Sequence, residues 1–312
     1  MTHPQVAIVV INWKLKETTL ECIRSVERSG TPCRVLVVDN GSGDGSVEYF
    51  AEHAPDAEII ALPKNVGFGR ACNIAIRRVL IDPTSEYILL LNNDAIIEPE
   101  TLPALLAAAA AAPQVGIFGP KIYYHDRPDT FWYAGSRRRR WVFAAADTGR
   151  GQRDTGQFEQ RCEVDYIFGA AMLIRRQVFE TVGMFDEQFF LYLEDLDLCL
   201  MTQRSGFPLH FVPQARVWHS VSASTHDHLG IRRYHMVRST ILFLKKHTTA
   251  WTFTPTLLFW PLVGLHFLLN DVLAGHVGVM RLYFSGLFHG MLPAKPDQSG
   301  GDNLKTSQIT SD

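Results

Sequence analysis

The stretch VVDNGSGDGS, residues 37–46, joins the end of an apolar run to a turn rich in glycine and acidic residues. Its apolar part belongs to Val35–Val38, and the first hundred residues contain similar runs at Val6–Ile11, Glu58–Leu62 and Tyr87–Leu91. Short continuous apolar runs are typical of strands buried on both faces. The sequence therefore predicts a parallel sheet with polar turns at the carboxyl ends of its strands.

Helical patterns separate these runs. Leu20, Ile23 and Val26 recur at a spacing of three, and the apolar residues of 71–79 follow the same period. Strand–helix alternation of this kind predicts an α/β, doubly wound sheet. Further along the chain we expect an alanine-rich helix at 101–112, strands at 171–174 and 215–218, and helices at 176–182 and 196–204.

The composition is that of an ordinary globular protein. The 312 residues are 46% hydrophobic and 20% charged, which argues against wholesale disorder and against a fibrous repeat. A net charge of −2 argues against a nucleic-acid binder. The five cysteines form no CxxC pair, which favours a reducing compartment over a disulfide framework or a zinc site. Residues 1–4 lead directly into a strand-like run, so we expect a cytoplasmic protein.

The C-terminal part has a different character. Residues 229–292 contain six lysines and arginines and one aspartate, and 248–270 contain no charged residue. Prolines, a glycine and threonines interrupt this uncharged segment, so an interfacial or re-entrant element at a membrane is favoured over a true span or a buried core. Trp251, Trp260 and the pair Lys245–Lys246 suit an interface. The polar residues 293–312 predict a disordered tail.

Arg137–Arg140 is a run of four arginines in a stretch that contains glycine, aspartate and aromatic residues. The sequence favours a solvated loop there. Contact with a phosphate or an anionic membrane is the alternative.

Two turns have the composition of a nucleotide site. Asp39 follows a strand and can accept hydrogen bonds from a base or a ribose, although an Asx-turn gives the same pattern. In 65–69 (NVGFG) the glycines permit close backbone approach and the following helix N-terminus favours anions. This is not the GxGxxG fingerprint, and an ordinary strand–helix turn remains open.

Four acidic or imidazole side chains could carry chemistry. Asp94 follows the strongest apolar run and could ligand Mg²⁺ or Mn²⁺, or it could be a turn aspartate. His219 closes a strand and would complete a metal site if it lies near Asp94, although structural histidines are common there. Glu194 and Asp195 start a helix, where one of them could act as a general base and the other as a capping residue.

The order of these features resembles glycosyltransferase family 2, in particular its bacterial rhamnosyltransferase-like branch. The stretches that carry the resemblance are VVINW, VVDNGSGDGS, NVGFGRACN, LLLNNDA, FGAAMLIRR, FDEQFFLYLEDLDLCL and VPQARVWHSVSAS, within residues 6–224. The resemblance implies a GT-A fold, inverting chemistry, a nucleotide-sugar donor and a divalent metal, Mg²⁺ or Mn²⁺. Two departures are Asn92, where the metal motif usually has its first acid, and Ser239, where an asparagine is usual.

Matched position by position, the resemblance implies Asp195 as catalytic base and Asp94 and His219 as metal contacts. The residues predicted to bind the nucleotide sugar are Asn12, Asp39, Asn65, Gly67, Arg70, Asn93 and Arg238. The residues predicted to bind the acceptor are Gly169, Ala170 and Glu194.

The sequence thus predicts an inverting glycosyltransferase of cell-surface glycan synthesis that moves a sugar, rhamnose from dTDP-rhamnose, to a lipid-linked or polysaccharide acceptor. We expect a catalytic domain at 1–225, a helical, membrane-associating region at 226–292 and a tail at 293–312. The expected location is the inner face of the plasma membrane, with a homodimer left open and no nucleic-acid partner. Two rivals remain: another nucleotide-sugar enzyme such as a nucleotidyltransferase, and a non-catalytic carbohydrate-binding protein.

Overall fold

The computed structural model describes residues 5–139, 144–220 and 229–292. The strands are β1 (Val6–Asn12), β2 (Cys33–Asp39), β3 (Glu58–Ala61), β4 (Tyr87–Asn92), β5 (Ala95–Ile97), β6 (Ile117–Tyr124), β7 (Phe131–Tyr133), β8 (Ser136–Arg139), β9 (Ala144–Asp147), β10 (Cys162–Val164), β11 (Ala171–Arg175) and β12 (Leu209–His219). The helices are α1 (Lys16–Glu27), α2 (Ser46–His53), α3 (Phe68–Leu80), α4 (Thr101–Ala111), α5 (Arg176–Val182), α6 (Glu194–Arg204), α7 (Leu229–His247), α8 (Ala250–Leu273) and α9 (Val279–Met291).

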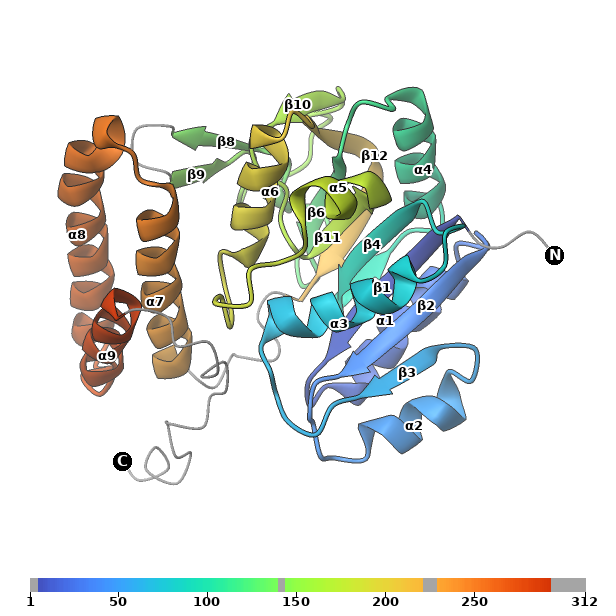
Figure 1. Ribbon diagram of the computed structural model, residues 1–312, viewed down its shortest axis with the longest axis horizontal. Helices are drawn as coiled ribbons and strands as arrows, with labels where there is room; N and C mark the ends of the chain where they lie inside the picture. The colour runs from blue at the N-terminus through green and yellow to red at the C-terminus, as the bar shows by residue number, and fades with distance from the viewer. Residues whose placement is uncertain (1–4, 140–143, 221–228, 293–312) are drawn as a thin grey trace.

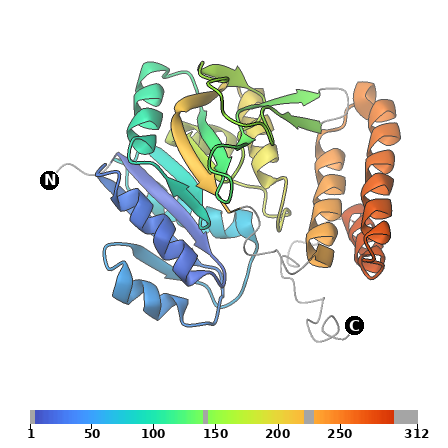
Figure 2. The ribbon, with the colours of Figure 1, turned by 180° about the vertical axis from the view of Figure 1, so that it is seen from behind.

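The N-terminal half of the main sheet is parallel, as the apolar runs predict. Its strand order is β3-β2-β1-β4, and each neighbouring pair runs in the same direction. Every residue of β1 is buried, because helices cover both of its faces. Figure 1 shows α3 in front of this half of the sheet, and the reverse view in Figure 2 shows α1 and α2 in front. This arrangement is the doubly wound α/β architecture that the alternation predicts.

The other half of the sheet is mixed. Its order continues from β4 through β11, β6 and β12 to β10. β11 is antiparallel to both of its neighbours, whereas β6 and β12 are parallel to each other. The short β5, which follows the carboxyl end of β4 after two residues, pairs antiparallel with the end of β12. β5 and β12 thereby bring the residues around 94 and 219 to one edge.

A separate hairpin occupies part of the arginine run. β8 and β9 pair antiparallel, with Arg137 opposite Ala146 and Arg138 opposite Ala145. The solvated loop predicted for Arg137–Arg140 is therefore wrong for the residues up to 139, because their backbone pairs with the alanine-rich strand. Residue 140 lies outside the described part of the chain.

The C-terminal helices form a layer beside the sheet domain (Figure 1), with α9 packed along α7. Two glycines of α9 permit this close packing: a Cβ on Gly286 would lie 2.6 Å from the Tyr234 carbonyl, and one on Gly290 would lie 3.1 Å from the Arg238 carbonyl. Within the described residues, no helix combines the length and apolar character that crossing a membrane requires. The predicted tail at 293–312 lies outside the described residues.

Candidate active site

Polar side chains meet where β1 and β2 end. The strand register pairs Asn12 with Asp39. The Asn12 amide donates to Asp39 Oδ1 at 2.7 Å and to Ser42 Oγ at 3.1 Å, and its Oδ1 accepts from the Thr19 hydroxyl at 2.8 Å. Asn12 has no exposed surface. The buried Asn12 side chain thus positions Asp39, and its predicted contact with the nucleotide sugar stays a prediction.

Asp39 lies at a cleft of about 470 Å³ beyond the ends of β2 and β3. The cleft is lined by Asp39, Gly41, Gly43, Gly45, Ser46, Val47, Glu48, Ala61, Leu62 and Pro63. Its three glycines all have positive φ, which keeps the turn before α2 narrow and free of side chains. The two carboxylates of the lining disfavour a diphosphate but suit the hydroxyl and N–H donors of a nucleoside.

A chain of hydrogen bonds joins Asp39 to the turn after β4. The Asn93 amide donates to the Thr19 hydroxyl at 3.0 Å, and Thr19 in turn donates to Asn12. Asn93 is mostly buried. The chain Asp39–Asn12–Thr19–Asn93 therefore fixes two predicted donor-binding positions relative to each other, and contact of Asn93 with the donor stays a prediction.

The loop before α3 has structural partners. Asn65 Oδ1 accepts from the Gly67 N–H at 2.9 Å and from the Asn40 amide at 3.1 Å. A Cβ on Gly67 would lie 2.6 Å from the Phe190 carbonyl oxygen, which also accepts the Phe68 N–H at 2.8 Å. The Phe68 N–H is therefore already bonded within the chain, and anion binding at this helix N-terminus stays a prediction. Donor contacts from Asn65 and Gly67 stay predictions.

Arg70, on the first turn of α3, lies beside an acidic residue of the loop before α6. Its Nε is 3.5 Å from Glu187 Oε2, and Arg77 pairs with the other oxygen of Glu187 at 2.9 Å. These two arginines, together with the Asn73 amide, lower the pKa of Glu187, although partial burial acts in the opposite direction. Arg70 thus holds α3 and this loop together, and its contact with the donor stays a prediction.

The two predicted metal contacts lie side by side. His219 Nε2 is 3.0 Å from Asp94 Oδ1, and both side chains are buried. The Asn92 amide lies 3.3 Å from the same ring nitrogen, and the Ser220 N–H donates to the Asp94 carbonyl at 3.0 Å. The structure therefore brings together residues that the sequence separates by more than a hundred positions.

Few side chains at this edge of the sheet could act as metal ligands. Among the described residues there is no group of three or more His, Cys, Asp and Glu side chains that could hold a metal ion. One carboxylate oxygen and one imidazole nitrogen converge, and the buried His219 Nδ1 has no hydrogen-bond partner. These two ligands fit a divalent ion that takes its remaining ligands from nucleotide phosphates and water.

A strained turn precedes α6. Tyr192 and Leu193 both have positive φ, 71° and 66°, which is uncommon for residues other than glycine. Such strain persists only where surrounding contacts impose it, and it is frequent at functional sites. The turn places Glu194 and Asp195 at the first residues of α6.

Three donors hold Asp195. Its Oδ2 accepts from the Tyr166 hydroxyl at 2.6 Å and from the Gly169 N–H at 2.8 Å, and its Oδ1 accepts from the Leu196 N–H at 2.8 Å. Burial raises the pKa of the Asp195 carboxyl, and these hydrogen bonds act in the opposite direction. A carboxylate oxygen has two lone pairs, so Oδ2 is fully engaged, whereas Oδ1 keeps one lone pair. Asp195 therefore has both a fixed orientation and the capacity to accept another proton.

Glu194 lies next to α3. The Cβ position of Gly69 in α3 lies 3.7 Å from the Glu194 Cβ, and Glu194 Oε2 is buried without a hydrogen-bond partner. Burial raises the pKa of Glu194 well above its usual range, and the charge of Asp195 adds to the effect. Its predicted contact with the acceptor stays a prediction.

Gly169 and Ala170 connect the two sides of the site. A Cβ on Gly169 would lie 2.9 Å from Asp195 Oδ2, so only glycine fits there without displacing the carboxylate. Ala170 has no exposed surface, and its carbonyl accepts the Asn92 N–H at 2.9 Å. Its side chain is enclosed by the core, and the predicted contact of Ala170 with the acceptor stays a prediction. For Gly169 the acceptor contact stays a prediction.

α7 contacts the loop that leads to α6. Arg238 Nη1 donates to the Gln188 carbonyl and Ser239 Oγ donates to the Leu191 carbonyl, both at 2.8 Å. The His235 ring stacks on Phe190, with ring centroids 4.8 Å apart. Arg238 is thus engaged with the chain itself, and its contact with the donor diphosphate stays a prediction.

Further along α7, buried ionic groups join this helix to α6. His247 Nε2 is 2.6 Å from Asp197 Oδ1, and Arg204 Nη1 is 2.8 Å from His247 Nδ1. Since arginine only donates, the Nδ1 accepts and the Nε2 carries the proton that Asp197 accepts. Lys246 Nζ donates to Asp197 at 3.0 Å and to Asp186 at 2.7 Å.

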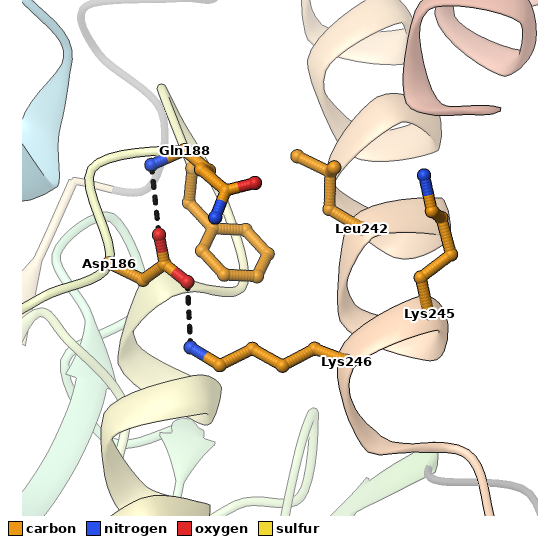
Figure 3. Close-up of a pocket in the computed structure, with 6 residues that line it drawn as sticks. Asp186, Gln188, Leu242, Lys245 and Lys246 are labelled. Atoms are coloured by element: carbon orange, nitrogen blue, oxygen red, sulfur yellow. Dashed lines mark hydrogen bonds and ion pairs between the residues drawn. The ribbon is translucent and has the colours of Figure 1, made fainter. Parts of the chain in front are cut away.

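Figure 3 shows the Lys246–Asp186 contact at a pocket of about 310 Å³ between α7 and the loop before α6. Leu242 and Lys245 of α7 line one side, and Asp186 and Gln188 line the other. The Lys245 ammonium donates to carbonyls at the end of α9, at 3.2 to 3.4 Å. Both lysines are therefore bonded within the protein although they are exposed, and their contact with a membrane stays a prediction.

Sequence reasoning missed Thr19 and Tyr166. Thr19 lies in α1, seven residues after Asn12, and its hydroxyl bridges Asn12 and Asn93. Tyr166 lies in the segment between β10 and β11 and bonds to Asp195. A polar residue shortly after an apolar run could have pointed to Thr19. No local pattern marks Tyr166, because its partner comes from another element.

A family model described as glycosyltransferase like family 2 matches residues 3–240. The chain belongs to this family. It is 30% identical over 256 residues to an N-acetylglucosaminyl-diphospho-decaprenol L-rhamnosyltransferase of Mycobacterium tuberculosis, covering 75% of this chain and 80% of that one. It is 26% identical over 253 residues to the dTDP-rhamnosyl transferase RfbF of Shigella flexneri, covering 77% and 79%. The resemblance to the rhamnosyltransferase-like branch is thereby confirmed.

Solved structures confirm the fold. The chain superposes on Staphylococcus aureus TarS with a TM-score of 0.55 at 15% identity, covering 81% of this chain and 43% of that one. It superposes on GalNAc-T7, solved with UDP, GalNAc and Mn²⁺, with the same TM-score and identity, covering 69% and 43%. The glycosyltransferase spans less than half the length of both solved chains, and the predicted GT-A-type α/β fold is correct.

Proposed function

We propose that this glycosyltransferase moves rhamnose from dTDP-rhamnose to a lipid-linked or saccharide acceptor in cell-surface glycan synthesis. The observation that carries the proposal is the 30% identity, over three quarters of the chain, to a relative named for rhamnosyl transfer to N-acetylglucosaminyl-diphospho-decaprenol. RfbF, whose name gives dTDP-rhamnose chemistry, supports the nucleotide. The cleft at Asp39 takes the nucleoside, because its carboxylates accept hydrogen bonds and its glycines leave room for the rings.

The chemistry is a single displacement with inversion. The Asp195 carboxylate removes the proton from the acceptor hydroxyl as that oxygen bonds to the anomeric carbon. On the opposite face the bond from the anomeric carbon to the diphosphate oxygen breaks, and the nucleoside diphosphate leaves with its electrons. One base suffices because no enzyme-bound sugar forms. The raised pKa of the buried Asp195 makes it a stronger base than an exposed aspartate.

Asp94 and His219 would hold a divalent ion, Mg²⁺ or Mn²⁺, with the donor diphosphate as the further ligand. When bound, such an ion offsets the negative charge that gathers on a leaving diphosphate. Asn92 and Asn93 complete this edge as neutral hydrogen-bonding groups.

The location we propose is the inner face of the plasma membrane. α8 exposes Leu258, Leu262, Leu265, Leu269 and Leu273, spaced by three or four residues along one side of the helix. An apolar helix face of this kind binds a lipid surface by burying leucine side chains at the headgroup boundary. Lys246 is paired with two carboxylates, whereas Lys245 donates to neutral carbonyls and keeps its charge, so the apolar face supplies most of the attraction and Lys245 adds to it.

One alternative partner for the leucine side of α8 and two alternative functions of the protein remain for experiment to distinguish. A second copy of the chain could cover the leucine side of α8 and give a homodimer. A nucleotidyltransferase would consume a sugar phosphate and a nucleoside triphosphate, and a non-catalytic protein would bind donors without turnover.

The proposal is tested with the full-length chain, dTDP-rhamnose, and an acceptor in which N-acetylglucosamine is linked through diphosphate to a polyprenol. We expect release of dTDP and a product one rhamnose heavier, both lost in excess chelator and restored by Mg²⁺ or Mn²⁺. Asp195→Asn should lower kcat by roughly 10²–10⁴ while donor affinity is kept. Asp126→Asn, at a carboxylate whose side chain is 78% exposed, is the control and should act like wild type.

Different failures would refute different parts of the proposal. Turnover of another nucleotide sugar in place of dTDP-rhamnose would refute the rhamnosyl assignment. Full activity in chelator would refute the metal site, and wild-type kcat for Asp195→Asn would refute the base. Donor binding without turnover of any nucleotide sugar would favour a carbohydrate-binding protein.

A further inference from the structure

Tyr166 is the one side chain outside α6 that bonds directly to Asp195 in the hydrogen bonds of the described residues. Its hydroxyl donates to Asp195 Oδ2 at 2.6 Å, and the tyrosine is buried. The Tyr133 hydroxyl donates to the Tyr166 backbone carbonyl at 2.6 Å, which fixes the segment between β10 and β11 that carries it. The hydroxyl therefore reaches the carboxylate from a rigid part of the core.

We propose that Tyr166 is a positioning residue for the base: its hydroxyl fixes the Asp195 carboxylate and sets the pH above which that carboxylate is charged. The inference rests on the proposed function, in which Asp195 accepts the proton of the acceptor hydroxyl. Tyr166 touches neither sugar in this role, and it acts through Asp195 alone.

The physical argument starts from the cost of a buried charge. An ionised carboxylate in the interior needs hydrogen-bond donors, because water no longer stabilises it. Asp195 has two backbone donors, from Gly169 and Leu196, and one side-chain donor, from Tyr166. A bond between a hydroxyl and a charged oxygen is among the stronger ones in proteins. Removing it disfavours the charged form more than the neutral form.

The ionisable groups around Asp195 do not replace this donor. Glu194 and Cys199 of α6 and Tyr133 of β7 interact with Asp195 directly. Beyond these lie Cys72 of α3 beside Glu194, Asp147 of β9 beside the two tyrosines, and Asp197 of α6 with Lys246 and His247 of α7 bound to it. Glu194 and Asp197, if charged, repel a charge on Asp195, and the thiols and Tyr133 are neutral at ordinary pH. Stabilisation of the Asp195 charge therefore depends on its hydrogen bonds.

Tyr166 itself stays protonated. Burial raises the pKa of its hydroxyl well above the ordinary value, and the charge of Asp195 raises it further. The tyrosine is thus a permanent donor and does not compete with Asp195 for the role of base.

The experiment measures kcat/KM for rhamnosyl transfer, or for donor hydrolysis, against pH. Tyr166→Phe keeps the ring and removes the donor, so the pKa of Asp195 rises. The acid limb should then move to higher pH by about 1 unit, which is a roughly tenfold loss at a fixed pH on that limb. The KM for the donor should change little, because Tyr166 does not contact it.

Tyr123→Phe is the matched control. The Tyr123 hydroxyl also donates to a carboxylate, Asp154 Oδ2, at 2.6 Å, and this pair lies outside the proposed site. The control should leave the acid limb in place. Thermal melting of both variants reports any loss of folding, and 3-fluorotyrosine at position 166 covers that case. This analogue keeps the hydroxyl, donates more strongly and should move the limb to lower pH.

An acid limb that stays in place in Tyr166→Phe, or that moves equally in Tyr123→Phe, overturns the inference. If Asp195→Asn is inactive in the same assay, the proposed base survives that outcome. If Asp195→Asn retains wild-type turnover, both the base and the role of Tyr166 fall.

Discussion

α7 and α8 follow each other in the chain, but their relations to the sheet domain differ. α7 makes directional polar contacts: Ser239 and Arg238 bond to carbonyls of the loop before α6, and His247 bonds to Asp197 within α6. α8 instead exposes a row of leucines, of which Leu262 is 67% and Leu273 is 85% exposed. Directional hydrogen bonds hold two elements in one relative orientation, whereas an exposed apolar face can pack against any apolar partner. The difference indicates that α7 holds the loop before α6 in place, whereas α8 presents an apolar surface to a partner.

The contacts of α7 also help to define where the predicted catalytic domain ends. The sequence predicts a boundary between residues 225 and 226, and that boundary stays a prediction. The family match extends to residue 240 and so includes Arg238 and Ser239. The contacts of these residues with the loop before α6 give a physical reason for treating α7 together with the sheet domain.

The largest effect is expected at the junction of α6 and α7. Asp197→Ala removes the acceptor of His247 Nε2 and one of the two carboxylates bonded to Lys246. Breaking a buried ionic cluster on one side should lower the free energy of unfolding by roughly 3–5 kcal/mol. Urea unfolding measures it, with Asp126→Ala, at an exposed pair with Arg127, as a control expected to change stability by less than about 0.5 kcal/mol. A loss for Asp197→Ala no larger than the control would contradict the view that this cluster ties α7 to α6.

A smaller effect is expected one contact closer to the base. Ser239→Ala removes the hydrogen bond to the Leu191 carbonyl, at the start of the turn formed by Tyr192 and Leu193. We expect about 1 kcal/mol of lost stability and a several-fold lower kcat at unchanged donor KM, because the turn places Asp195. Steady-state kinetics measures the split between kcat and KM.

Thr240→Ala is the control for this variant, since the Thr240 hydroxyl donates to the Met236 carbonyl of its own helix. Equal kinetic losses for Ser239→Ala and Thr240→Ala would show that α7 matters for folding and not for the placement of the base.

Much of the fold was predictable because the parallel strands are buried on both faces. The predicted run at Val6–Ile11 lies within β1, and the run at Tyr87–Leu91 lies within β4. The hairpin of β8 and β9 was not predictable, since arginines opposite alanines carry no apolar alternation. The antiparallel direction of β11 was also hidden, because a short apolar run reads the same in either direction.

The site was predictable where polar residues follow strands. Asp94 and His219 both follow strand signals, and the pairing of β5 with β12 brings them together. The steric reason for a glycine at position 67 was not predictable. It is the nearby Phe190 carbonyl, which comes from a distant loop. Local sequence thus marks where chemistry can occur, and tertiary packing decides which atoms each group meets.

The smallest effect on stability, and the sharpest test of the contrast, is expected on α8. Leu262→Ser combined with Leu269→Ser should leave unfolding free energy and donor hydrolysis unchanged within about 0.5 kcal/mol, because both side chains are at least half exposed. Burying such a leucine in lipid is worth about 1 kcal/mol or more, so the double variant should bind vesicles at least tenfold more weakly. Ile81→Ser, at an isoleucine that is 72% exposed beyond the end of α3, is the control and should bind like wild type. Because Lys246 is paired with carboxylates and the single charge of Lys245 is worth about 1 kcal/mol at an anionic surface, neutral and anionic vesicles should bind within a few-fold of each other in a sedimentation assay. If the double variant binds vesicles like wild type but turns a dimer into a monomer in light scattering, the leucines face a second copy of the chain and the membrane proposal is wrong.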